Sequence, residues 1–252
     1  ALPSWLDALI EQEYDDHLDA IAEASRHRPP MTLRVNSIRN ERDAYLRLLT
    51  DADLLAHPLD HLSDGITLRQ PVDVSSLPGF FDGLVSVQDS AAQRVADLIN
   101  PQPGERILDA CAAPGGKSTH ILSLISDNSF LIANETIAQR ANILAENCTR
   151  WGNANVIVCN NDPAHFTDFE NCFDVVVIDA PCSGEGMFRK DPAARLEWNE
   201  GNVKLCSARQ QRILEEATKL VKPGGILIYS TCTFSEEEDE MQILPLISSG
   251  DW

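Results

Sequence analysis

Five short apolar runs constrain what this chain can fold into more than any other feature of its sequence. They cover residues 106–109, 130–133, 155–158, 174–178 and 225–229. Each run is short, rich in β-branched residues and apolar on both faces, which is typical of parallel strands buried inside a sheet. Helical patterns separate several runs: one begins at Thr136 and ends near Gly152, and another begins at Ser207 and ends at Pro223. This alternation predicts an α/β fold whose parallel sheet has helices on both faces.

The first 82 residues follow a different pattern. They are typical of a helix, a strand, a helix and a strand, and Pro29-Pro30 interrupts the chain before an alternating strand pattern at 32–36. Leu77-Pro78-Gly79 marks a loop ahead of a boundary near residue 83. We therefore predict a small α+β module at 1–82 and a parallel-sheet domain at 83–252.

The composition argues against several classes of protein. The chain has 252 residues, with 20 Lys and Arg against 39 Asp and Glu, which gives a net charge of −19. This acidity argues against indiscriminate binding to nucleic acid or to an anionic membrane. No apolar run approaches the ~20 residues that span a bilayer, and the first residues show no charged-then-apolar leader. The seven cysteines form no Cys-x-x-Cys pair, which argues against a disulfide framework or zinc ribbon and favours a reducing cytoplasm.

Basic residues concentrate in two segments of this acidic chain. Residues 26–47 hold six arginines against two acids, and residues 187–212 hold six basic residues against three acids. Two such segments can line one cleft that binds a polyanion. The alternative is that they are solvated helix faces and strand edges, and charge alone favours that alternative.

Ligands of open parallel sheets bind at the carboxyl ends of the strands, so the residues after each run are the candidates for chemistry. The first run is followed by Ala-Cys-Ala-Ala-Pro-Gly-Gly-Lys at 110–117. Gly115 and Gly116 let the backbone approach a ligand closely, and the next helix offers its N-terminal amides. A P-loop needs glycine where Cys111 stands, and the dinucleotide fingerprint is also absent. A nucleotide-phosphate enzyme built on Gly116-Lys117-Ser118 is therefore disfavoured.

Single acids follow the second and third runs. Glu135 comes where a ribose diol would be held by two hydrogen bonds, or it is an acid that favours the start of a helix. Asp162 follows the third run, where it either accepts from an adenine amino group or serves as a turn residue.

A carboxylate and two thiols follow the last two runs. Asp179 and Cys182 come after the fourth run, and Cys232 comes after the fifth. If these strands are neighbours, their ends place both thiols and the carboxylate at one cleft. A single cysteine is usually a small buried hydrophobic residue, but two at adjacent strand ends favour a chemical role.

These strings, in this order, resemble the RNA cytosine-5 methyltransferases of the NOL1/NOP2/Sun family, and the match covers nearly the whole chain. It rests on the strings at 109–117, 179–184 (Asp-Ala-Pro-Cys-Ser-Gly) and 230–233 (Ser-Thr-Cys-Thr). Residues 1–123 look like the bacterial small-subunit rRNA methyltransferase B branch, and 130–240 look more like the F branch. The resemblance implies a Rossmann-like class I methyltransferase domain after an N-terminal RNA-binding module. The family's fold adds edge strands after the helix that follows Cys232, and we expect these to be missing here.

The resemblance also implies residue roles. Cys232 would be the nucleophile that adds to carbon 6 of cytosine, Cys182 would assist release of the adduct, and Asp179 would hydrogen-bond the base. S-adenosylmethionine is the implied cofactor. Its expected contacts are Cys111, Ala112, Ala113, Pro114, Gly115, Gly116, Lys117, Glu135, Arg140, Asp162 and Asp179.

RNA is the implied partner, most specifically small-subunit rRNA. Arg34 and Asn36 match the Arg-x-Asn element of the family's N-terminal module, and we expect them to bind RNA together with Arg189 and Lys190. We expect no membrane and no metal as partners, and a cytoplasmic monomer. The alternative function is a catalytically silent RNA-binding or scaffold protein of the same descent, which the short C-terminus and the charge keep open.

Overall fold

A computed structural model describes residues 4–14 and 17–250 of the chain. The described residues fall into two compact units, each containing segments that are far apart in sequence. Unit 1 comprises the described residues up to Pro29 together with 181–211 and 231–250. Unit 2 comprises Pro30–Ala180 and Arg212–Ser230.

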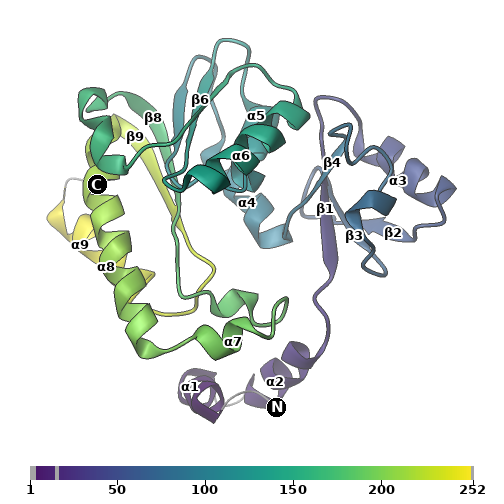
Figure 1. Ribbon diagram of the computed structural model, residues 1–252, viewed down its shortest axis with the longest axis horizontal. Coiled ribbons are helices and arrows are strands. Elements are labelled where there is room, and N and C mark those ends of the chain that lie inside the picture. Colours follow the sequence, from purple (N-terminus) through teal and green to yellow (C-terminus); the bar gives the residue numbers. More distant parts are fainter. Residues whose placement is uncertain (1–3, 15–16, 251–252) are drawn as a thin grey trace. The chain divides into compact units, whose positions relative to one another are not determined.

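Unit 2 contains the predicted parallel sheet (Figure 1). Its strand order is β7-β6-β5-β8-β9, with every neighbouring pair parallel. The strands are β5 (Arg106–Asp109), β6 (Phe130–Asn134), β7 (Val156–Cys159), β8 (Phe173–Asp179) and β9 (Val221–Ser230). The five apolar runs therefore form five strands, and the α/β class is confirmed.

The last strand begins earlier than the sequence pattern suggests. A short 3-10 helix at Thr218–Leu220 leads directly into β9 at Val221, so Pro223 and Gly224 lie within the strand instead of before it. A proline has no N–H to donate to a ladder, and it is tolerated here because β9 is an edge of the described sheet.

Helices flank this sheet. They are α4 (Ser90–Ile99), α5 (Gly116–Leu124), α6 (Ala138–Trp151) and the end of α8 (Glu200–Ala217), and a 3-10 segment spans Pro163–Phe169. The core between sheet and helices includes Ile107, Leu131, Val175 and Leu144, all fully buried. α6 ends at Trp151 with Gly152 as its C-cap, near the predicted end, and it begins at Ala138, two residues after the predicted start at Thr136. α8 begins at Glu200, seven residues before the predicted start at Ser207, and the side chain of Asn199 accepts a hydrogen bond from the backbone N of Asn202 at this end.

Unit 2 also contains a small antiparallel sheet of order β2-β3-β1-β4. Its strands are β1 (Met31–Val35), β2 (Ala56–Pro58), β3 (Gly65–Leu68) and β4 (Val85–Val87), accompanied by α3 (Arg42–Asp51) and a 3-10 turn at Val74–Ser76. Leu33, Tyr45 and Ile66 are fully buried in its core. A small antiparallel sheet with a helix is therefore present as expected, but β4 lies past residue 82 and pairs with β1, and the residues before Pro30 belong to unit 1.

The regular structure in the described residues of unit 1 is helical. It contains α1 (Ser4–Tyr14), α2 (Leu18–Arg26), α7 (Ala194–Glu197), the first part of α8, α9 (Glu240–Ser249) and a 3-10 turn at Glu185–Met187. In the described part of the chain, none of the helices combines the length and apolar character needed to cross a membrane.

Candidate active site

The loop that follows β5 begins at a buried acid. Asp109 is the last residue of β5, is fully buried, and accepts a hydrogen bond of 2.6 Å from Ser118 Oγ. Its other oxygen, Oδ1, is buried with no hydrogen-bond partner. Burial raises the pKa of Asp109 to about 6; the negative charge of Asp179 adds to this and the Ser118 hydrogen bond opposes it. An unpartnered acceptor next to a glycine-rich turn is suited to a ligand that carries donors.

The next residues form a turn that α6 holds from the side. Arg140 Nη2 donates to the carbonyl of Ala113 at 2.8 Å, and Asn147 Nδ2 donates to that of Pro114 at 2.7 Å. Gly115 caps α5 with φ of +108°, a conformation that favours glycine. The first amides of α5 therefore remain at the carboxyl end of the sheet, where they suit an anionic group. Cys111 lies in this turn, and burial raises its pKa to about 12, so its thiol stays neutral.

Glu135 and Asp162 follow β6 and β7 and already have protein partners. The Glu135 side chain is nearly buried, lies 3.2 Å from Arg140 Nη1, and accepts from the backbone N of Ile137 at 2.9 Å. Asp162 accepts from the backbone N of Ala164 at 3.1 Å and pairs with Arg212 at 3.1 Å. Both acids thus have the structural roles named as alternatives above, and both still lie at strand ends.

Asp179 ends β8 and is joined to Lys117. The Nζ of Lys117 lies 2.7 Å from Oδ2 of Asp179, and Ser230 Oγ donates to Oδ1 at 3.1 Å. The Lys117 side chain is 12% exposed, whereas the Asp179 side chain is 40% exposed. Lys117 therefore contacts Asp179, and the carboxylate of Asp179 stays accessible to a ligand.

The two candidate catalytic cysteines lie together in unit 1. Cys182 Sγ and Cys232 Sγ are 3.0 Å apart, and the backbone N of Cys232 donates to Cys182 Sγ at 3.3 Å. Cys232 is exposed, whereas Cys182 is half-buried. The hydrogen bond with Cys232, followed by burial, raises the pKa of the Cys182 thiol above its ordinary range. The Cys182 thiol therefore holds its proton strongly.

Two buried carboxylates tie together the loops that carry these thiols, and sequence analysis missed both. Glu238 is fully buried and accepts from Ser183 N at 3.0 Å and Gln210 Nε2 at 2.8 Å, and also from Ser183 Oγ. Glu185 accepts from Ser183 Oγ at 2.9 Å, from Thr233 Oγ1, and from Trp198 Nε1 at 2.5 Å. We call Glu185 and Glu238 the carboxylate clamp. The available signal was the position of Glu238 in an acidic run just after Cys232, but spacing alone does not show which acid turns inward.

Arg34 and Asn36 correct the sequence prediction, because both side chains are fully buried and cannot contact RNA here. Arg34 donates from Nε to Gln88 at 2.6 Å and from Nη2 to Thr119 Oγ1 at 2.7 Å, and it lies 4.3 Å over the Trp151 ring. Asn36 Nδ2 donates to the carbonyls of Gly83 at 2.8 Å and Trp151 at 3.0 Å. These two residues join the antiparallel sheet to α5 and α6.

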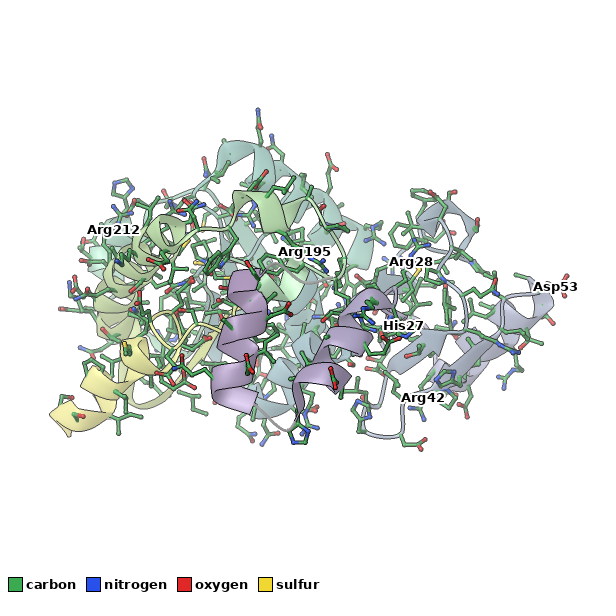
Figure 2. The ribbon with its side chains drawn as sticks, turned by 90° about the horizontal axis from the view of Figure 1, so that it is seen from below. His27, Arg28, Arg42, Asp53, Arg195 and Arg212 are labelled. Atoms are coloured by element: carbon green, nitrogen blue, oxygen red, sulfur yellow. The ribbon has the colours of Figure 1, made fainter. Side chains whose placement is uncertain are left out.

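Arg189 and Lys190, the other two residues expected to bind RNA, line a cavity of about 450 Å³ in unit 1. Arg26, Arg28 and Arg195 also line it. Figure 2 labels Arg28 and Arg195 among the side chains of this region. We call this the basic cavity, defined by these five cationic residues.

Comparison with known proteins identifies the family. A family model described as 16S rRNA methyltransferase RsmB/F matches residues 96–251, and a model of the RsmF/B-like ferredoxin-like domain matches residues 2–75. This chain belongs to the RsmB/F methyltransferase family. The predicted family is therefore confirmed, and it is a family of S-adenosylmethionine-dependent methyltransferases.

Individual relatives of this chain agree with the assignment to that family. Ribosomal RNA small subunit methyltransferase B of Yersinia pseudotuberculosis is 40% identical over 96% of this chain and 56% of its own length. The chain thus spans about half the length of such curated relatives. A methyltransferase homolog from Pyrococcus horikoshii is 28% identical, with a TM-score of 0.80 over 93% of this chain and 75% of its own. NSun6 from the same organism, solved with SFG, has the same fold, with 20% identity and a TM-score of 0.89 over 98% of this chain and 88% of its own.

Proposed function

We propose that this chain transfers a methyl group from S-adenosylmethionine to carbon 5 of a cytosine in small-subunit ribosomal RNA. The observation that carries the proposal is the pair of thiols at 3.0 Å, one exposed and one half-buried, in a member of this family. Carbon 5 of cytosine is a poor nucleophile. Addition of a thiolate at carbon 6 makes carbon 5 enamine-like, so covalent catalysis divides one difficult step into easier ones.

The two cysteines have different roles in this proposal. The thiolate of Cys232, the exposed sulfur, adds to carbon 6 and forms the S–C bond, while the Cys182 thiol donates a hydrogen bond to it. S-adenosylmethionine would supply the methyl group to carbon 5 and leave as S-adenosylhomocysteine. Once Cys232 is bonded to carbon 6, its hydrogen bond no longer raises the pKa of Cys182, so Cys182 can lose its proton to solvent. The Cys182 thiolate then removes the proton from carbon 5, and the electron pair left behind expels Cys232 from carbon 6 as a thiolate. Burial and the charge of Glu238 still raise the pKa of Cys182, so its thiolate is a strong base for this step.

Residues of unit 2 are suited to hold the cofactor. The unpartnered Oδ1 of Asp109 offers an acceptor, and the first amides of α5 offer donors, at the carboxyl ends of the strands. In this proposal Asp109 and the turn that ends at Lys117 would hold the methionine end, Glu135 the ribose, and Asp162 the adenine. Arg140 keeps both Glu135 and the turn in place. The accessible carboxylate of Asp179 would hydrogen-bond the base.

Trapping of the covalent adduct tests the assignment. Cys182→Ala should accumulate a protein–RNA adduct that survives a denaturing gel, because release is blocked. Cys232→Ala should form none, and the control variant Cys206→Ala, at a half-buried cysteine of unit 1, should turn over like the parent chain. The reverse pattern would exchange the two roles. Intact RNA binding without adduct or 5-methylcytosine in any variant would support the silent RNA-binding alternative.

A further inference from the structure

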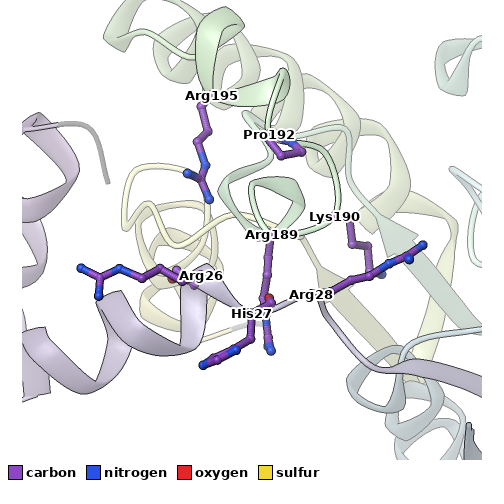
Figure 3. Close-up of a pocket in the computed structure, with 8 residues that line it drawn as sticks. Arg26, His27, Arg28, Arg189, Lys190, Pro192 and Arg195 are labelled. Atoms are coloured by element: carbon purple, nitrogen blue, oxygen red, sulfur yellow. Dashed lines mark hydrogen bonds between the residues drawn. The ribbon is translucent and has the colours of Figure 1, made fainter. Parts of the chain in front are cut away.

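The basic cavity brings together residues from both basic segments of the sequence. Arg26 and Arg28 come from the end of α2 and the residues after it, Arg189 and Lys190 follow the 3-10 turn at Glu185–Met187, and Arg195 lies on α7 (Figure 3). The Nε of Arg189 donates to the carbonyl of His27 at 3.0 Å, so a hydrogen bond joins the two segments.

The charge of this cavity calls for an anion. Among the described residues that line it there is no carboxylate, although the whole chain carries a net charge of −19. Arg26 has a local explanation, because it pairs with Glu23 at 2.7 Å in the last turn of α2. Arg28 and Arg195 come from separate places in the chain and meet in a lining that holds five cations, and bringing like charges together is unfavourable.

The side chain of Arg195 also has an unpartnered donor at this cavity. Its Nε is buried and has no hydrogen-bond partner, although a guanidinium is an obligatory donor. In Figure 3 this side chain extends from α7 toward the other cations of the cavity. A phosphate group suits such a site, because guanidinium groups bind its oxygens through paired N–H donors.

The lining also decides which part of a nucleic acid would bind. No Phe, Tyr or Trp side chain is found among the described lining residues, and five of the eight are cationic. Cationic side chains bind mainly phosphate oxygens, and such contacts position the strand without reading its sequence. The segment that carries Arg189, Lys190 and Arg195 also carries Cys182 and Glu185, and Trp198 at its end bonds to Glu185 at 2.5 Å.

We infer that the basic cavity binds the phosphodiester backbone of the RNA substrate through Arg28, Lys190 and Arg195, an inference that rests on the proposed function. Binding of the RNA backbone at this cavity holds the RNA on the same segment of the chain that carries Cys182. The cavity therefore supplies affinity and strand position.

Fluorescence anisotropy with a labelled single-stranded RNA of about 20 nucleotides tests this inference on the full chain. The variant Arg28→Glu/Lys190→Glu/Arg195→Glu should lose on the order of tenfold or more in affinity at 0.1 M salt. Its plot of log affinity against log salt should be shallower by about 2, because each lost phosphate contact on a single strand removes roughly 0.7 of slope. The matched control is Arg94→Glu, an exposed arginine on α4, which should bind like the parent chain.

A neutral variant keeps the test independent of folding. If the charge reversals unfold the chain, Arg28→Gln/Lys190→Gln/Arg195→Gln should still show the weaker binding and the shallower salt slope. Parental affinity and slope in a folded cavity variant would overturn the inference, and so would a parent chain that does not bind the RNA probe.

The inference and the proposed function can fail separately. Calorimetric titration with S-adenosylmethionine should give the same affinity for the parent chain and the cavity variants. Loss of RNA affinity in the cavity variants, in a chain that never forms 5-methylcytosine, would leave the cavity assignment standing and remove the proposed reaction. Normal RNA affinity in those variants, in a chain that does form 5-methylcytosine, would remove the cavity assignment and leave the proposed reaction standing.

Discussion

Asp109 holds a carboxyl group whose protonation changes in a moderately acidic range. Burial raises its pKa from 3.8 to about 6, so between these values the folded chain binds a proton that the unfolded chain does not. This contribution to stability is fully present below pH 3.8 and is lost as the pH rises through 6. The loss is on the order of 2–3 kcal/mol, because a tenfold change in proton affinity corresponds to about 1.4 kcal/mol.

The variant Asp109→Asn should remove that pH dependence. Urea unfolding of both proteins at several pH values should show the free energy of unfolding of the parent chain decreasing, relative to the variant, between about pH 4 and pH 6. A constant difference across this range would contradict the raised pKa. The variant Asp97→Asn serves as the control, because this acid is exposed on α4.

Glu238 influences Cys182 through its charge as well as through its hydrogen bond from the backbone N of Ser183. The pKa of the Cys182 thiol is raised mainly by the hydrogen bond with Cys232 and by burial, and the negative charge of Glu238 raises it further. In a Cys232→Ser background, Glu238→Gln should therefore increase the thiolate fraction of Cys182. Alkylation of Cys182 by iodoacetamide at pH 8, mapped by mass spectrometry, should become at least about twofold faster.

The same measurement separates this charge effect from a loss of packing. Glu236→Gln changes an exposed acid two residues away and should leave the rate of Cys182 alkylation unchanged. Slower alkylation in the Glu238 variant would contradict the electrostatic argument. Equal acceleration in both variants would assign the effect to the general acidity of this segment.

The contact between the antiparallel sheet and α6 depends on one glycine. Gly83 has φ of +74°, and a Cβ added there would lie 2.0 Å from the backbone oxygen of Arg150. Neither the left-handed backbone nor the carbonyl can give way easily, so Gly83→Ala should lower the free energy of unfolding by about 3 kcal/mol or more. Gly104 has a similar φ of +87° but only an ordinary contact at 3.5 Å, so Gly104→Ala should cost about 1–2 kcal/mol.

Urea unfolding of the two alanine variants gives the comparison directly. Because both glycines have positive φ, the difference between the variants measures the clash and not the backbone conformation. Equal destabilisation would mean that the end of α6 moves aside at no cost. The contact formed by Asn36 with the carbonyls of Gly83 and Trp151 would then be less rigid than the structure suggests.

The strands were predictable because their environment is uniform. Buried parallel strands appear as unbroken apolar runs, as in Val175–Val177, all of which are fully buried. The start of α8 was not predictable, because a Ser-x-x-Gln spacing at Ser207 and Gln210 suggested a capping box. In the structure these side chains make tertiary contacts instead: Ser207 Oγ donates to the carbonyl of Glu237, and Gln210 Nε2 donates to Glu238.

The role of Arg34 was hidden for a similar reason. An arginine in an alternating strand next to a basic segment is usually exposed, but the residues that bury this one lie about 80 to 120 positions further along the chain. Thr119 and Trp151 are among them. The place of Asp179 at the end of β8 could be predicted, because topology alone brings parallel strand ends to one edge. The carboxylate clamp depends on side-chain direction, which the sequence pattern does not contain.

At the scale of the whole molecule, the distribution of charge limits where RNA can bind. With 39 acids against 20 basic residues, most of the surface repels a polyanion, whereas the basic cavity concentrates five cations. If the cavity binds RNA as inferred, this charge distribution confines RNA to a defined place and opposes indiscriminate binding. Salt should weaken that binding, because phosphate contacts release counterions.

The same net charge should make folding respond to salt in the opposite direction. A charge of −19 destabilises the compact state through self-repulsion, and salt reduces the range of that repulsion from about 10 Å at 0.1 M to about 3 Å at 1 M. Thermal unfolding at pH 7.5 should therefore show Tm rising by a few degrees between these NaCl concentrations. At pH 5, close to the isoelectric point of about 4.5, the net charge is small and the increase should be much smaller. A Tm that falls with salt at pH 7.5, or rises equally at both pH values, would show that self-repulsion is not what limits the stability of this fold.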